Sequence, residues 1–166
     1  MTSLPAMRGR AAFIFNEPNF DVDRIIGFDA MRSHNVEHMK AEAMKEFDPD
    51  FRKNVLDGDF LIGGSNFGYG HPHGPPMDIM RSFGIAGVVA ESFAPLYFFG
   101  EIAAGFPQIA CPEILSFVGR WDEIEIDLES ATVFNISRGY GLPAVPLSLS
   151  DKMTIASGGL LKRLKR

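Results

Sequence analysis

Apolar and polar positions follow one another along the chain in patterns that predict strands and helices. The run 85–90, IAGVVA, is apolar throughout, which is typical of a strand covered on both faces of a sheet. The run 122–130 alternates strictly, with Ile124, Ile126 and Leu128 on one side, so we expect the other face of that strand to contact water. Further strands are predicted at 11–15, 59–64, 131–136 and 144–149.

Helical periodicity accounts for much of the remaining chain. Apolar side chains recur at helical spacing over 35–47, two consecutive prolines suit the first turn of a helix over 75–82, and a third helix is predicted over 94–104. The segment 16–27 is predicted to be a turn followed by a short extended piece. Strands and helices alternate in the middle and strands dominate the end, which predicts one α/β domain over residues 1–166, with a parallel centre and an antiparallel portion.

Composition and charge narrow the functional classes. The 166 residues are 46% hydrophobic and 22% charged, as in an ordinary globular protein. The net charge of −5 disfavours nucleic acid as a partner, and we interpret the basic tail LLKRLKR as cations that complete the last turn of a helix. The chain has no apolar run of 18 residues and begins without the apolar core of a signal peptide, so we expect a cytoplasmic protein without membrane contact.

Cysteine and histidine positions bear on redox and metal chemistry. Cys111 is the only cysteine, so the chain can neither form an internal disulfide nor hold an iron–sulfur cluster by itself. His34, Glu37 and His38 match the H-x-x-E-H pattern of one class of zinc protease. No third ligand on a later helix is evident, so we interpret this match as chance.

The most unusual stretch is the loop 64–76, GSNFGYGHPHGPP, which joins the strand 59–64 to the helix 75–82. Glycines lose much backbone freedom on folding, so such a loop is costly to order unless a ligand requires its shape. Its position before a helix is typical of an anion site made by backbone amides or of a tight structural turn, and it matches neither a P-loop nor a dinucleotide-binding fingerprint. His71 and His73 are candidate metal ligands, but two ligands do not make a site, so we expect no metal in this chain.

Four stretches carry a resemblance to a known family. They are NFDVDRIIG (19–27), FDPDF (47–51), GSNFGYG (64–70) and the segment 83–106. Together they resemble the small subunit of 3-isopropylmalate dehydratase, equivalent to the swivelling C-terminal domain of aconitase, whose patterns include N-I-D-T-D-x-I-I-P and G-x-N-F-G-C-G. The resemblance covers about residues 10–130 and implies the fold of that family, a swivelling β/β/α domain.

The resemblance also implies an activity, a hydro-lyase that works only together with a large subunit. In that family the large subunit carries a four-iron, four-sulfur cluster that binds the substrate hydroxyl and one carboxylate, and the small subunit closes over it. We therefore expect no cofactor in this chain, a cluster in the partner, and a hydroxy di- or tricarboxylic acid such as 3-isopropylmalate as substrate. The candidate substrate-binding residues are Asn66, Gly68, Tyr69 and Gly70, together with Arg32.

The chain departs from the family pattern directly after Gly70. The family continues S-S-R-E-H-A-P, in which the first serine is the catalytic base and the arginine grips a substrate carboxylate. Here the sequence is HPHGPPM, without serine or arginine. His71 stands in line with the base, and an imidazole is well suited to proton abstraction at neutral pH. His73 stands in line with the arginine, and we expect its protonated ring to donate to a carboxylate.

The sequence leaves three functions open. The first is the hydro-lyase subunit just described. The second is a non-catalytic relative that has lost the serine and the arginine and binds a partner or an acid metabolite. The third is an autonomous metal enzyme that uses the histidines. Metal analysis of the purified chain and a partner pull-down distinguish the three.

Overall fold

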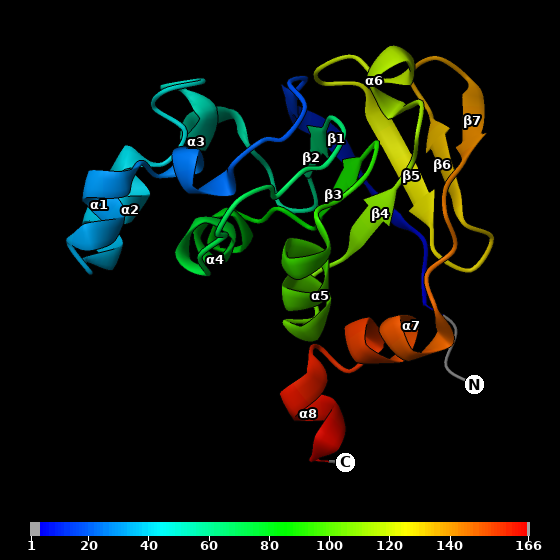
Figure 1. Cartoon of the computed structure of the whole chain (residues 1–166). Coiled ribbons are helices and arrows are strands. Elements are labelled where there is room, and N and C mark those ends of the chain that lie inside the picture. The colour runs from blue at the N-terminus through cyan, green and yellow to red at the C-terminus, as the bar shows by residue number, and fades with distance from the viewer. Residues whose placement is uncertain (1–3, 166) are drawn as a thin grey trace.

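A computed structural model describes residues 4–165, which form a mixed sheet of seven strands in the order β4-β3-β2-β1-β5-β6-β7 (Figure 1). The strands are β1 Met7–Phe15, β2 Phe60–Gly63, β3 Gly87–Ala90, β4 Gln108–Ala110, β5 Glu123–Asp127, β6 Thr132–Asn135 and β7 Tyr140–Pro143. The sheet changes direction at β1, which pairs in parallel with β2 and antiparallel with β5. On one side, β2, β3 and β4 also pair in parallel, and on the other side β5, β6 and β7 also pair antiparallel. The predicted parallel centre and antiparallel portion are therefore confirmed.

Burial along the strands follows the hydrophobic pattern. Every residue of β3 is buried, as the uninterrupted apolar run 85–90 predicts. In β5 the side chains of Ile124 and Ile126 are buried, whereas Glu125 between them is partly exposed. Leu128, just past the end of β5, is also buried. The predicted alternation is therefore confirmed.

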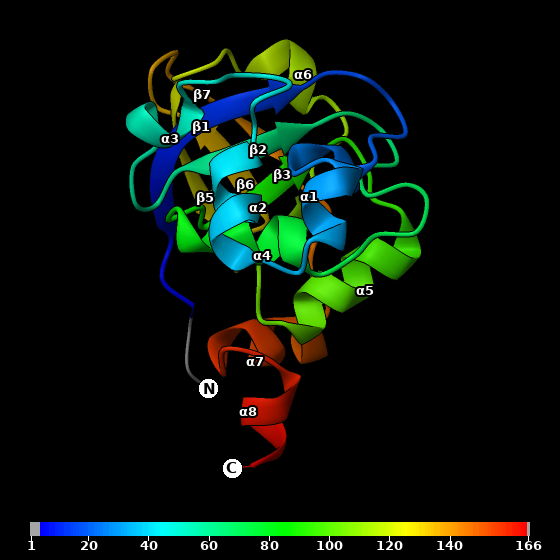
Figure 2. The same ribbon diagram turned by 90° about the vertical axis from the view of Figure 1, so that its left-hand side faces the viewer.

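The helices lie mainly over the parallel half of the sheet. They are η1 Val22–Ile25, which is a 3-10 helix, α1 Phe28–Arg32, α2 Val36–Glu42, α3 Phe51–Asn54, α4 Pro75–Ser82, α5 Pro95–Ala103, α6 Ile114–Phe117, α7 Leu149–Ala156 and α8 Leu160–Leu164. Figure 2 shows α1, α2 and α4 in front of the parallel strands, with α7 and α8 at one end of the molecule. Within residues 4–165, every helix is too short or too polar to cross a bilayer.

An aromatic cluster joins the end of β1 to the loop that follows β2. The rings of Phe15 and Phe20 stack with centroids 4.3 Å apart, and Phe20 stacks on Phe67 at 5.4 Å. All three side chains are buried, and each such burial contributes about 1.5–3 kcal/mol. Since Phe67 belongs to the glycine-rich loop, the core fixes the first part of that loop.

The predicted helix over 35–47 is shorter in the structure and ends as α2 at Glu42. Met44 takes up a left-handed backbone conformation with φ of 66° and donates its N–H to the carbonyl of Ile25 at 2.7 Å. Its side chain is fully buried, so a tertiary contact turns the chain out of the helix. The extended piece predicted within 16–27 is also wrong, because that stretch forms the 3-10 helix η1.

The C-terminal part differs from the sequence prediction as well. The strand predicted over 144–149 is wrong, since β7 is formed by Tyr140–Pro143 and α7 begins at Leu149. Ser148 caps that helix by accepting the N–H of Asp151 at 3.1 Å. The basic tail does form a helix, α8, with cations in its last turn, and residue 166 lies outside the described residues.

Candidate functional site

The glycine-rich loop lies where parallel strands end. Residues 64–74 connect β2 to α4, and the carboxyl ends of β1 and β3 meet the same edge of the sheet. In α/β sheets this edge is where ligands bind most often. The topology therefore favours this loop as the ligand-binding site.

The first half of the loop, 64–68, is tied to the fold by backbone hydrogen bonds. Gly64 donates to the carbonyl of Phe15 at 2.9 Å, and Gly68 donates to the carbonyl of Phe20 at 2.9 Å. The amide of Asn66 donates to the Ser92 hydroxyl at 2.8 Å. These partners come from three different parts of the chain, so this half of the loop has a fixed shape.

Two residues of this half have a left-handed backbone. Asn66, with φ of 55°, uses its side-chain amide to donate to Asn19 Oδ1 at 2.7 Å. Gly68 has φ of 84°, and a Cβ atom there would overlap the ring of Tyr97. Only glycine fits position 68, for reasons both of backbone conformation and of space.

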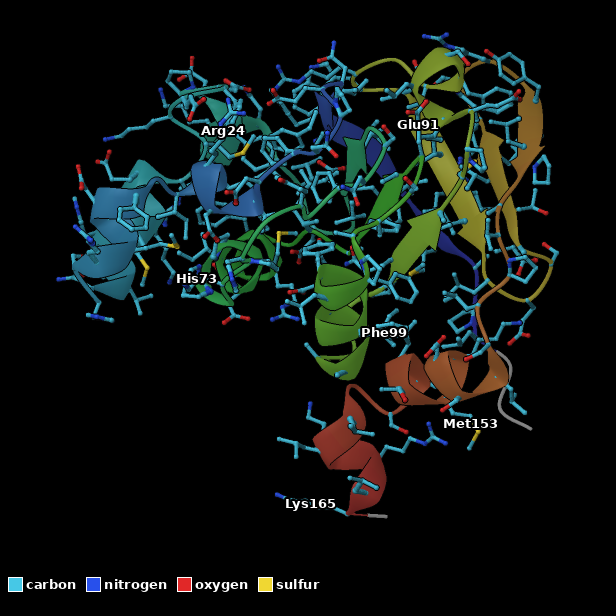
Figure 3. All side chains as sticks on the ribbon, in the orientation of Figure 1. Arg24, His73, Glu91, Phe99, Met153 and Lys165 are labelled. Atoms are coloured by element: carbon cyan, nitrogen blue, oxygen red, sulfur yellow. The ribbon has the colours of Figure 1, made fainter. Side chains whose placement is uncertain are left out.

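The second half of the loop, 69–74, lies at the surface. Tyr69 is 54% exposed, and both histidines are exposed. His73 is held by Asp23 of η1: its backbone N–H lies 3.1 Å from Asp23 Oδ1, and its ring Nδ1 lies 2.7 Å from Asp23 Oδ2. In Figure 3 the ring of His73 lies beside α4, on the side that faces α1.

An open depression of about 440 Å³ brings this half of the loop next to η1 and α1. It is lined by Asp21, Asp23, Arg24, Gly27, Phe28, Glu46, His71 and His73. The structure thus brings together the two histidines that the sequence singled out. It adds the two aspartates of the FDVD stretch, which sequence reasoning used only to recognise the family.

The depression is acidic at neutral pH. It holds three carboxylates, whereas the one arginine in its lining is already engaged. Arg24 donates to Glu17 at 2.6 Å and to Glu46, and the hydrogen bond to Glu46 is the main cause that raises the pKa of its guanidinium. The site therefore favours a positive charge more than a free anion.

The other predicted substrate-binding residues are not part of the lining of the depression. Asn66 and Gly68 belong to the fixed half of the loop and do not line it, and neither do Tyr69 and Gly70. Arg32, at the end of α1, is exposed and stacks its guanidinium 4.5 Å above the ring of Phe28, which does line the depression.

The metal-binding patterns do not assemble into a site. His34 lies before Asn35, the residue that caps α2, so it does not share a helical face with His38. Among residues 4–165 no three histidine, cysteine or acidic side chains cluster as metal ligands. Burial is the main cause that raises the pKa of the Cys111 thiol to about 11, and a single neutral thiol does not fit an iron–sulfur cluster.

Similar proteins are found among sequences and among solved structures, although no family model matches the chain. The chain is 33% identical to the isopropylmalate/citramalate isomerase small subunit of Methanocaldococcus jannaschii over 89% of this chain and 88% of that protein. It is 32% identical to the 3-isopropylmalate dehydratase small subunit of Brachyspira hyodysenteriae, over 89% and 90% of the two chains. The crystal structure of a 3-isopropylmalate dehydratase chain from M. jannaschii superposes with a TM-score of 0.83 at 25% identity, over 97% of this chain and 94% of that one.

These matches extend over nearly the whole chain and agree in sequence and in fold. The structural match confirms the expected swivelling α/β architecture, including both halves of the mixed sheet. The sequence matches exceed 30% identity with several small subunits. The chain therefore belongs to the family of 3-isopropylmalate dehydratase small subunits.

Proposed function

We propose that this chain is the small subunit of a dehydratase that removes water reversibly from a hydroxy dicarboxylic acid. The observation that carries the proposal is family membership along nearly the whole chain. Relatives in this family act, by their names, on isopropylmalate, citramalate or 2,3-dimethylmalate. All three are malates with alkyl substituents, so the substrate class we propose is an alkylmalate.

The proposal includes a large partner subunit that carries the iron–sulfur cluster. The one thiol of this chain, Cys111, is buried and donates to the carbonyl of Pro143 at 3.7 Å, so a cluster has to come from another chain. In the partner, the cluster would supply a Lewis acid for the substrate hydroxyl. The proposal also places the enzyme in the cytoplasm, where thiols stay reduced.

This chain contributes the surface half of its loop to the shared site. His71 and His73 line the same depression and stand where the family has its serine and arginine. We propose that both rings contact the substrate when the large subunit covers the depression. Tyr69 and Gly70, exposed on the same stretch, would complete the contact surface.

Co-expression with a large subunit of the same family tests the proposal. We expect a brown complex that dehydrates an alkylmalate, whereas this chain alone is colourless and inactive. A stable complex with no dehydratase activity on any alkylmalate would support the non-catalytic alternative. Near-equimolar zinc or iron in the chain purified alone would support the autonomous metal enzyme instead.

A further inference from the structure

Asp23 and His73 make a two-point contact across 50 positions of sequence. One carboxylate oxygen accepts the backbone N–H of His73 at 3.1 Å, and the other lies 2.7 Å from ring atom Nδ1. The Asp23 side chain is only 14% exposed, whereas that of His73 is 57% exposed. The contact therefore anchors one edge of the imidazole of a side chain that lines the depression and remains more than half exposed.

The position of Asp23 is itself fixed. It lies in the first turn of η1, and its backbone N–H donates to Asp21 Oδ1 at 2.9 Å. Its carbonyl accepts the N–H of Gly27, which closes the turn at 2.9 Å. A carboxylate held in this way orients the ring that it contacts.

The contact determines which ring nitrogen of His73 carries the proton. An ionised carboxylate can only accept hydrogen bonds, so Nδ1 must be the donor. In the neutral ring the lone pair is then on Nε2, at the exposed edge. His71 has no comparable orientation, because its ring forms no hydrogen bond with any residue between 4 and 165.

We propose that His73 Nε2 is the proton acceptor of the dehydration and that Asp23 is its positioning residue. Nε2 takes the proton from the substrate carbon next to a carboxylate, and the electron pair of that C–H bond forms the double bond. The bond between the neighbouring carbon and the hydroxyl breaks, the hydroxide takes a proton from solvent and leaves as water, and His73 later releases its proton to solvent. This assignment rests on the proposed function and reverses the roles that alignment with the family pattern gives to the two histidines.

The electrostatics of the depression favour this role for His73 over that of a carboxylate ligand. Proton abstraction creates an imidazolium, and the Asp23 carboxylate stabilises that cation as it develops. Asp21 and Glu46 line the same depression, and both add negative charge. Because these three acidic groups repel an anion, the proposal assigns the substrate carboxylates to the partner subunit and only the C–H bond to His73.

The tautomer of His73 can be measured without a partner or a substrate. Long-range ¹H–¹⁵N spectra of the isolated chain distinguish the two neutral tautomers, and the His73 signal is identified by its loss in His73→Ala. We expect a proton on Nδ1 in the native chain and a shift towards the Nε2–H tautomer in Asp23→Ala. The matched control is Asp29→Asn on α1, which removes one negative charge outside the depression and leaves the signal unchanged. A native His73 with its proton on Nε2 would overturn the proposal.

Kinetics of the assembled complex then test the role of His73. His73→Asn keeps an amide N–H that can donate to Asp23 but removes the basic ring nitrogen Nε2. We expect kcat to fall by about 10²–10⁴ with KM changed by less than about threefold. Asp23→Ala should lower kcat by about tenfold or more, and His71→Ala should raise KM more than it lowers kcat. A large kcat loss in His71→Ala with full activity in His73→Asn would return the base to position 71. An inactive native complex would reject the proposed function, while the spectra would still report on the pair.

Discussion

The two halves of the loop between β2 and α4 are held in different ways. The half 64–68 donates backbone hydrogen bonds to β1, to Phe20 and to Ser92, and it places Phe67 in the aromatic core. The half 69–74 is exposed and is anchored chiefly through the contact between His73 and Asp23. The first half resembles the family pattern closely, and the second half departs from it after Gly70.

The packed residues 64–68 are constrained by the fold, whereas the exposed residues 69–74 are free to vary with the chemistry of the site. A substitution in the half 64–68 meets packed neighbours and a constrained backbone, so few side chains are compatible with it. A substitution at position 71 or 73 meets solvent, so the chain can change its chemistry there without a penalty in packing. Histidines at positions 71 and 73, where the family pattern has serine and arginine, therefore change the exposed side chains of the loop without disturbing its packed part.

The largest effect should come from adding one methyl group to the packed half. In Gly68→Ala the new Cβ overlaps the Tyr97 ring, and φ of 84° disfavours alanine. Strain and overpacking together should lower the free energy of unfolding by about 2–5 kcal/mol, measured by urea denaturation of the isolated chain.

Gly70→Ala is the matched control in the surface half. Gly70 has φ of 95°, but the nearest atom to an added Cβ would be Asp21 Oδ2 at 3.6 Å, an ordinary contact. We expect the backbone penalty alone, about 1–2 kcal/mol. Equal losses in the two variants would show that packing does not distinguish the two halves.

A second, smaller effect on stability concerns a buried carboxyl on α5, the helix whose Tyr97 packs against Gly68. Glu101 is on α5, one turn from Tyr97, and burial raises the pKa of its carboxyl to about 7, while Arg81 opposes the shift and Asp78 adds to it. Arg81 Nη1 lies 3.6 Å from Glu101 Oε2, which has no hydrogen-bond partner among residues 4–165. The charged form is therefore poorly compensated in the folded protein.

The sign of the pH dependence follows from that raised pKa. The carboxyl ionises near 4.5 in the unfolded chain and near 7 in the folded one. Between these values the folded state binds more protons, so the free energy of unfolding falls as pH rises, by about 3 kcal/mol in total. Glu101→Gln should remove this fall and leave the variant more stable than the native chain at pH 8. The control Glu37→Gln, on exposed α2, should keep the native slope, and a native slope in Glu101→Gln would assign the pH dependence to another group.

The sequence predicted the frame of the fold better than its details. The strands predicted at 59–64 and 85–90 and the helix that begins with the two prolines are encoded locally, by uninterrupted apolar runs and by proline at the helix start. The early end of α2 is not encoded locally. It depends on two tertiary features, the hydrogen bond from the Met44 N–H to the carbonyl of Ile25 and the burial of the Met44 side chain. The strand expected at 144–149 failed because Pro146 cannot take part in a ladder and Ser148 caps α7 instead.

The candidate site was predictable only in part, for a similar reason. The loop and its two histidines are visible as an unusual local composition, and the family resemblance gives them their place. Asp23, the partner of His73, is 50 positions away, and nothing in the sequence connects the two residues. Asp23 is the second aspartate of the FDVD stretch. That stretch contributes to the family resemblance but does not indicate a role for the residue.

The smallest effect should come from the proline between the two histidines. Pro72 limits the backbone of the surface half, and Pro72→Ala should lower the free energy of unfolding by only about 0.4–1 kcal/mol, because the unfolded chain gains freedom. Freedom gained by the folded loop instead would leave the free energy of unfolding unchanged, make the productive conformation about two- to fivefold less populated, and lower kcat/KM of the complex by that factor. The His73 tautomer should not change, because Asp23 holds that ring directly. An activity loss of a hundredfold or more would mean that proline, rather than Asp23, positions the histidines, and the two halves of the loop would then be equally dependent on backbone constraint.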